Sequence, residues 1–174
     1  MMKPVMAILA LLLLAAGLRA AEVPAARLAA MDAHALAAPA EAEASVPALA
    51  AYLSGPARTD TEKARAIFRW MAERISYFPL SLRPQQPPPR QPEDVLRARR
   101  AVCDGYCRLF EALARAAGLE TATIEGYAKG YGYAAAGLAG RDYAAAGLAD
   151  RPDHCWSAVR ADGITELRGA AVEP

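Results

Sequence analysis

The sequence predicts an α+β fold in which one helix, bearing a candidate nucleophile, packs against a small antiparallel sheet. Two segments, 64–75 and 103–117, carry apolar side chains at helical spacing. Segment 121–127 alternates and is rich in β-branched residues, and 154–159 resumes a strand-like pattern. Asp162-Gly163 then predicts a hairpin turn, although the residues after it form a poor return strand.

Length and charge favour one domain and exclude a nucleic-acid-binding protein. The chain has 174 residues and a mass of 18.4 kDa, the size of a single domain. Its 20 Lys and Arg residues nearly balance its 19 Asp and Glu residues, which leaves a formal charge of +1. No long-range field therefore recruits nucleic acid or an acidic membrane surface.

The amino terminus predicts a signal peptide over residues 1–20. A short start containing Lys3 precedes an unbroken apolar run over 5–16, and Leu18-Arg19-Ala20 ends in a small residue. We therefore expect a secreted or periplasmic protein, with an uncleaved membrane anchor as the alternative. The run is too short to span a bilayer comfortably, and no later stretch approaches about 20 apolar residues, so no stable membrane span is expected after signal removal.

Residues 21–45 are predicted to form a linker or frayed helix. They are rich in Ala, Glu and Pro with only scattered Leu28, Met31 and Leu36, so we expect this segment to bury little surface. His34, the one histidine in it, is interpreted as a solvated side chain. The folded domain is then expected over residues 46–174.

The first strong helix opens with a capping box at 59–62, in which the Thr59 hydroxyl and the Glu62 carboxylate can satisfy free N–H groups. Tyr77 and Phe78 after it indicate a brief extended segment. Five prolines between 84 and 92 indicate a stiff surface connector, and a ligand for proline-binding modules is the alternative.

A short helix is predicted from Pro92 to Arg100. Its acidic residues lie in the first turn, at the positive end of the helix dipole. Arg97, Arg99 and Arg100 lie at the other end, where we expect solvated side chains.

The second strong helix begins around Cys103 and stops at Gly118, a residue that accepts a left-handed conformation. Between the two predicted strands, the sequence Tyr-Ala-Ala-Ala-Gly-Leu-Ala occurs at 133–139 and again at 143–149. Two copies are too few for a solenoid, so we interpret this segment as a loop lengthened by a local duplication.

Cys103 and His154 are the candidate catalytic residues. A thiol acts as a nucleophile only as thiolate, and the N–H groups and dipole at the start of a helix favour that anion. A nucleophilic cysteine also needs a base, and His154 is the one histidine in a segment with a predicted regular structure. Together they suggest a Cys-His acyl-transfer site, although spacing alone is weak evidence.

Several segments, in order, resemble the transglutaminase-like superfamily. Residues 101–106, Ala-Val-Cys-Asp-Gly-Tyr, are similar to the family's nucleophile helix, usually Gly-Val-Cys-x-Gly-Tyr-Ala and then Leu-Phe, which here is 109–110. Residues 153–159, Asp-His-Cys-Trp-Ser-Ala-Val, resemble its Asn-His-Ala-Trp-Asn-Ala-Val strand. The resemblance covers about residues 46–163 and is nearest to the bacterial, kyphoscoliosis-peptidase-like branch.

The resemblance implies a papain-like or transglutaminase-like core, with Cys103 as nucleophile and His154 as general base and later acid. The family's third member is an Asp on the next strand, but that region here holds Gly169. We therefore expect a chain truncated or frame-shifted after the His strand, with weak or absent catalysis. In serine triads, loss of the orienting carboxylate costs about ten-thousandfold in rate. Asp162 and Glu166 are the nearest acids and would substitute only if the hairpin folds unusually.

Cys107 and Cys155 stand where the family usually has alanine. A zinc site of Cys103, Cys107, His154 and Cys155 can be drawn, but consecutive strand residues point to opposite faces, which argues against it. The same alternation argues against a Cys107–Cys155 disulfide, although export favours one. Small buried thiols are the simpler interpretation.

Two functions of different class follow. The first is an exported thiol acyl-transfer protein, a peptidase, transamidase or deamidase, with a protein or peptide substrate and no need for a metal or organic cofactor. The second is an exported binding domain that keeps the fold without catalysis. Rapid alkylation of Cys103 at about pH 6 would favour the thiol acyl-transfer protein.

Overall fold

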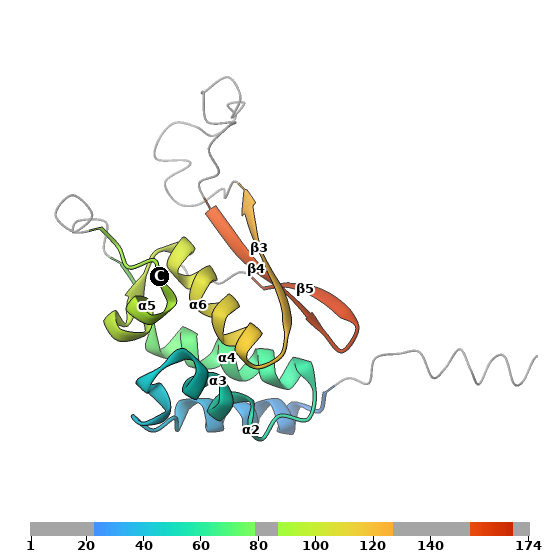
Figure 1. Ribbon diagram of the computed structural model, residues 1–174. Coiled ribbons are helices and arrows are strands. Elements are labelled where there is room, and N and C mark those ends of the chain that lie inside the picture. Colours follow the sequence, from blue (N-terminus) through green and yellow to red (C-terminus); the bar gives the residue numbers. More distant parts are fainter. Residues whose placement is uncertain (1–22, 79–86, 127–153, 169–174) are drawn as a thin grey trace, which may run out of the picture.

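The structure is a computed structural model that describes residues 23–78, 87–126 and 154–168, the last five by their backbone (Figure 1). Its helices are α2 (Ala25–Leu36), η1 (Ala42–Ala44), α3 (Val46–Ser54), α4 (Asp60–Arg74), α5 (Pro92–Ala98) and α6 (Cys103–Ala116). Its strands are β1 (Ser76–Tyr77), β2 (Arg100–Ala101), β3 (Glu120–Gly126), β4 (His154–Ala161) and β5 (Ile164–Arg168). The order of helices and then strands confirms the predicted α+β class.

Helix α6 is the central element of the fold. It contacts α3, α4 and α5 on one side and strands β3 and β4 on the other (Figure 1). Leu109 and Leu113 of α6 are fully buried, as are Trp70 of α4 and Val159 of β4. The helix ends as the sequence predicted, since Gly118 adopts a left-handed φ of 79°.

The main sheet is antiparallel, with strand order β3-β4-β5. Gly126 pairs with His154 at one end of the β3–β4 ladder, and Arg168 pairs with Ser157 in the β4–β5 ladder. The predicted turn joins β4 to β5, with φ of 51° at Asp162 and 83° at Gly163. The hairpin is therefore more complete than the poor pattern of its second strand indicated.

The turn also contacts a helix about a hundred residues away in the chain. The two carboxylate oxygens of Asp162 accept hydrogen bonds from the backbone N–H groups of Asp60 and Thr61, at 3.0 and 3.1 Å. These are free donors in the first turn of α4. The Thr59 hydroxyl caps the same end by accepting from Glu62 N. Asp162 thus joins the sheet to the start of α4.

Residues 21–45 were predicted to form a linker or frayed helix that buries little surface; residues 25–36 form helix α2, and its packing against α4 corrects the expectation of little burial. Met31 and Ala35 are buried. The abundant alanines let the two helices approach closely, and a bidentate pair between Arg65 and Asp32 joins them at 2.6 Å. His34 is not fully solvated either: its ring stacks on Tyr52, and its Nε2 lies 2.8 Å from the Tyr52 carbonyl.

Glu62 differs from its predicted role in a capping box. Its carboxylate is buried and receives two hydrogen bonds from Arg27 of α2, both at 2.8 Å, and one from Arg58 N. Hydrogen bonding from Arg27 lowers the pKa of Glu62 to about 2, although burial opposes that shift. Glu62 therefore ties the amino-terminal helix to α4.

Two of the three predicted solvated arginines are in fact packed against the domain. Arg99 takes a left-handed φ of 54°, pairs with Glu43 at 2.7 Å and lies over the ring of Trp70. Arg100 lies over the ring of Phe78. Only Arg97 is exposed, as predicted. Guanidinium groups stack well on aromatic rings, and no simple charge pattern indicates such a contact.

Three sequence predictions lie outside the described residues: the signal peptide, the duplicated segment over 133–149, and the amino-terminal part of the proline-rich connector. Residues 87–90 of that connector are described and form neither helix nor strand. Within the described ranges, no helix is long and apolar enough to cross a membrane.

Candidate active site

The site is built around Cys103, the first residue of α6. Val102 precedes it as the N-cap in an extended conformation, and its side chain makes no capping hydrogen bond. The N–H groups of the first turn therefore point outward without a side-chain acceptor from the cap. Cys103 itself is partly exposed, while Cys107, one turn later, is fully buried.

Three groups around Cys103 favour its thiolate through hydrogen bonding: the Cys155 thiol and the backbone N–H groups of Asp104 and Cys155. His154 adds a favourable charge interaction. The Cys155 hydrogen bond is the largest of these effects, and together they lower the pKa of Cys103 from 9.0 to about 6 against the opposing effect of burial. Above about pH 6 the residue is therefore mainly thiolate, the form that reacts with electrophiles.

His154 is the first residue of β4, at the same end of the domain as Cys103. Its ring meets the Trp156 ring edge-on, with centroids 4.8 Å apart, so these two residues share one face of the strand. Gly126 lies opposite His154, and a Cβ there would be 3.0 Å from the Trp156 ring. Trp156 thus supports the imidazole. The effect of His154 on Cys103 is Coulombic, whereas the hydrogen bonds to the sulfur come from Cys155 and Asp104.

Cys155 interacts with both thiols of α6. Its thiol hydrogen-bonds to both Cys103 and Cys107, and the pKa of Cys155 is raised mainly because these hydrogen bonds favour its protonated form. The same bond lowers the pKa of Cys107. All three cysteines are free. We name Cys103, Cys107 and Cys155 the thiol cluster.

The alternation expected along β4 from the sequence is observed, and the structure adds which face of the strand meets α6. His154 and Cys155 do lie on opposite faces of β4, but Cys155 is the one whose side chain meets the sulfurs of α6. The sequence carried a usable signal, since Cys103 and Cys107 at i and i+4 share one helix face. It did not show which alternate face of β4 packs against that helix.

Ser157 extends the buried polar line along β4. It is almost fully buried, and its Oγ has no oxygen or nitrogen partner. The polar group near it is the thiol of Cys107, a weak hydrogen-bonding group.

Asp104 is held away from catalytic work by two arginines. Its carboxylate accepts from Arg90 Nε at 2.6 Å and from Arg108 Nε at 2.8 Å. These hydrogen bonds lower its pKa, although burial opposes them and is the largest single influence. The pairs fasten the described part of the proline-rich connector to the start of α6.

Gly105 and Tyr106 fix the position of the helix start. A Cβ on Gly105 would lie 2.7 Å from the Pro89 carbonyl oxygen and 2.8 Å from the Ala101 Cβ, so only glycine fits. The Tyr106 hydroxyl donates to the Ile75 carbonyl oxygen, and burial raises its pKa to about 12. Tyr106 is therefore a structural residue.

Neither acid considered for the third triad position is placed beside His154. Asp162 is engaged at the start of α4, as described above. The register puts Glu166 opposite Val159, five residues along β4 from His154. Among the described residues, no carboxylate is seen to hydrogen-bond to the His154 ring. Nor does any group of three or more His, Cys, Asp or Glu residues there have an arrangement that could hold a metal ion.

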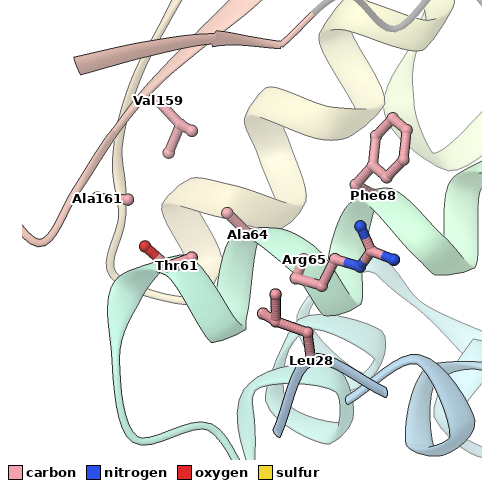
Figure 2. Close-up of a pocket in the computed structure, with 7 residues that line it drawn as sticks. All are labelled: Leu28, Thr61, Ala64, Arg65, Phe68, Val159 and Ala161. Atoms are coloured by element: carbon pink, nitrogen blue, oxygen red, sulfur yellow. The ribbon is translucent and has the colours of Figure 1, made fainter. Parts of the chain in front are cut away.

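An apolar groove lies elsewhere on the domain, where α2, α4 and β4 meet (Figure 2). Leu28, Phe68 and Val159 are among the side chains that line it (Figure 2). The one charged side chain there, Arg65, is paired with Asp32. The groove does not include Cys103 or His154, so it is separate from the candidate site.

Comparisons with known proteins agree with this architecture. A family model described as the transglutaminase-like superfamily matches residues 47–165. The chain is 34% identical to the human kyphoscoliosis peptidase over 111 residues. The aligned region makes up 64% of this chain and 15% of the human protein. The mouse kyphoscoliosis peptidase is 33% identical over the same length. The chain thus spans only a small part of these relatives.

A solved structure shares the fold. It is described as a "putative protease" from Parabacteroides distasonis, with a TM-score of 0.53 and 19% identity, over 86% of this chain and 26% of that one. The family-model match covers most of the chain, from the second residue of α3 to the start of β5, including the nucleophile helix and the histidine strand. The chain therefore belongs to the transglutaminase-like superfamily.

Proposed function

We propose that this protein performs thiol acyl transfer, with Cys103 as the nucleophile and His154 as the general base and acid. The observation that carries the proposal is the environment of the Cys103 sulfur at the start of α6, where the backbone N–H groups of Asp104 and Cys155 and the charge of His154 favour the thiolate. Such an environment is typical of reactive cysteines and differs from that of an inert buried thiol.

The proposed reaction begins with attack of the Cys103 thiolate on the carbonyl carbon of an amide. The negative charge that develops on the carbonyl oxygen would be stabilised by the backbone N–H of Cys103. The His154 imidazolium then donates a proton to the departing nitrogen, the C–N bond breaks, and a thioester remains on Cys103. Water or an amine, deprotonated by His154, attacks the thioester and releases the sulfur.

The proposed substrate is a protein or peptide. Two relatives are described as peptidases, and this supports a polypeptide substrate for the family to which the chain belongs. Export through a cleaved amino-terminal signal is part of the same proposal, supported by the charge and apolar pattern of residues 1–20.

The test is acylation of Cys103 in the reduced full chain. A glutamine-containing peptide is added, ammonia release is followed, and the protein is examined by mass spectrometry for a thioester on Cys103. We expect a Cys103-linked acyl adduct with slow turnover, because no carboxylate is seen to orient His154 in the described residues. The Cys103→Ala variant should form no adduct.

A non-catalytic binding domain is the second candidate, favoured by the same lack of a described carboxylate partner for His154. It predicts a folded protein that forms no acyl-enzyme with peptides or with activated esters. Absence of the adduct in both assays would reject the thiol acyl-transfer proposal. Rapid turnover would instead reject the expectation of weak catalysis.

A further inference from the structure

The first turn of α6 carries an excess of positive charge that the thiol chemistry does not use. The Asp104 carboxylate, next to Cys103 in the chain, accepts hydrogen bonds from Arg90 Nε at 2.6 Å and from Arg108 Nε at 2.8 Å. One anion therefore faces two cations beside the nucleophile. We name Arg90 and Arg108 the arginine pair.

The arginine pair is open to solvent. The side chains of Arg90 and Arg108 are 62% and 46% exposed, whereas that of Asp104 between them is 28% exposed. Each guanidinium binds Asp104 through Nε, and within the described ranges no hydrogen bond engages the terminal Nη groups. Guanidinium N–H groups bind carboxylates well in a side-by-side geometry. The arginine pair therefore keeps donors for a second anion.

Both guanidinium groups are held at the level of the nucleophile. Arg108 follows Cys103 by five residues, about 7.5 Å along the helix axis. Helical side chains tilt toward the amino end, and the hydrogen bond to Asp104 keeps the Arg108 guanidinium at the first turn. The connector that carries Arg90 packs against Gly105, where a Cβ would lie 2.7 Å from a connector carbonyl oxygen. Groups fixed in advance lose less freedom when a ligand binds.

Two further charged residues close to the nucleophile balance each other. Arg100 precedes Cys103 by three residues. Glu125 is exposed on β3 and pairs in register with Cys155. In the part of the chain that the structure describes, neither of these residues takes part in an ion pair. One cation and one anion cancel, so the excess charge of the arginine pair remains.

We propose that the arginine pair selects substrates that carry an acidic side chain close to the acyl group attacked by Cys103. This inference rests on the proposed function, because it names the substrate class of that reaction. An extended peptide advances about 3.3 Å per residue, so an acidic side chain within three residues of the reacting group can reach the Nη groups. A basic side chain at the same position is repelled.

The first test measures the charge selection without any turnover. Iodoacetate is anionic and iodoacetamide is neutral, and both react with the same thiolate, so the ratio of their rate constants at Cys103 is independent of the fraction ionised. The reduced full chain is alkylated at about pH 8, above the Cys103 pKa of about 6. Chymotrypsin, which cleaves after Tyr106, then separates Cys103 from Cys107 for mass spectrometry.

We expect Arg90→Gln and Arg108→Gln each to lower the ratio of iodoacetate to iodoacetamide rates about twofold in about 0.1 M salt. Arg115→Gln is the matched control. Arg115 also lies on α6, is 64% exposed and pairs with Glu111, but it is about 18 Å along the axis from Cys103, so the ratio should not change.

Asp104→Asn separates charge selection from a structural role. This variant removes the anion and keeps both cations, so the ratio should rise about twofold. If the ion pairs only held the helix start in place, breaking them from either side would move the ratio in the same direction. A ratio that falls in Asp104→Asn, or that does not change in the two arginine variants, would overturn the proposal. Circular dichroism shows whether each variant folds.

The second test uses peptides as ligands. Acetylated and amidated Gly-Glu-Gln-Glu-Gly and Gly-Lys-Gln-Lys-Gly are each added in excess while iodoacetamide alkylates Cys103. The acidic peptide should slow the alkylation more than the basic one, and the difference should disappear when both arginines are replaced by glutamine. Equal protection by the two peptides would overturn the proposal. Protection needs no reaction, so a missing acyl adduct on Cys103 would reject the proposed function and leave this measurement intact.

Discussion

Two of the three groups whose hydrogen bonding lowers the pKa of Cys103 belong to a single residue, Cys155. This residue could not be assigned from sequence, where it looked like a small buried thiol. Its burial was predicted correctly, and its contact with the nucleophile was not. Alternation along a strand says that neighbours face opposite ways, but only the packed sheet shows which face meets α6.

The Cys155→Ala variant tests this contact. The thiol makes the largest contribution to the lowered pKa of Cys103, so its removal should raise that pKa above about 6 and toward 9.0. The pH dependence of alkylation at Cys103, followed by mass spectrometry, measures the shift. Cys107→Ala is the control, because Cys107 is not among the groups that shift the pKa of Cys103. An unchanged pH midpoint of alkylation in Cys155→Ala would show that the backbone N–H groups and His154 suffice to lower the pKa of Cys103.

At the scale of elements, α6 and β4 were predicted well because each has a clear period. The helix was expected over 103–117 and is observed as Cys103–Ala116. The packing of helix α2 was not predicted, because its alanines bury little area each and its attachment depends on ion pairs with residues more than thirty positions away. Contacts of that kind leave no local pattern in a sequence.

Gly105→Ala tests the close approach of α6 to the residues before it. The added Cβ would meet the Pro89 carbonyl oxygen at 2.7 Å, so a rigid backbone atom must move. Overpacking of this kind costs about 1–3 kcal/mol, against roughly 1 kcal/mol gained from the better helix former. We expect a lower free energy of unfolding in urea and slower alkylation of Cys103. A variant as stable and reactive as the parent would show that the helix start can shift freely.

Asp162→Ala tests the contact between the hairpin turn and α4. The substitution removes acceptors for two free N–H groups and places alanine at a φ of 51°. Loss of a cap costs about 0.5–2 kcal/mol. Asp162→Asn is the matched control, since it tolerates the left-handed conformation and keeps one acceptor oxygen. Equal thermal unfolding midpoints for the Asp162→Ala and Asp162→Asn variants would mean that the Asp162 side chain does not cap α4.

On the scale of the whole molecule, the amino-terminal helix and the sheet are both tied to α4. Arg27 of α2 pairs with Glu62, and Asp162 at the end of the sheet accepts from Asp60 and Thr61. The predicted start of the folded domain at residue 46 was therefore too late for the structure observed, because α2 contributes to the same core. The α+β class and the order of the helix and strands were predicted correctly, since these follow from periodicity alone.

Acid should weaken the link between α2 and α4. The pKa of Glu62 is lowered from 4.5 to about 2, chiefly by the Arg27 hydrogen bond. Its contribution to stability is therefore fully present above about pH 4.5 and is lost as the pH falls through about 2. Near neutral pH the Glu62→Gln variant should be less stable than the parent by about 1.5–3 kcal/mol, because a hydrogen bond to a charged group contributes that much.

Urea unfolding of the parent and of Glu62→Gln, from neutral pH down to about pH 2, measures the difference between their free energies of unfolding. The gap between the parent and Glu62→Gln should narrow as the pH falls from 4.5 toward 2, where the parent's carboxyl group is also becoming neutral. Other carboxylates affect both proteins equally and cancel. A gap that stays constant with pH would mean that the charge of Glu62 does not stabilise the fold.

The pH dependence of Cys103 alkylation in the reduced chain tests thiol activation most directly. Iodoacetamide is reacted for short times at a series of pH values, and each cysteine is quantified after digestion with trypsin and chymotrypsin. The site described here predicts modification at Cys103 with a midpoint at about pH 6, while Cys107 and Cys155 remain largely unmodified. A midpoint near the ordinary thiol value of 9.0, or equal reaction at all three sulfurs, would contradict an activated nucleophile at this position.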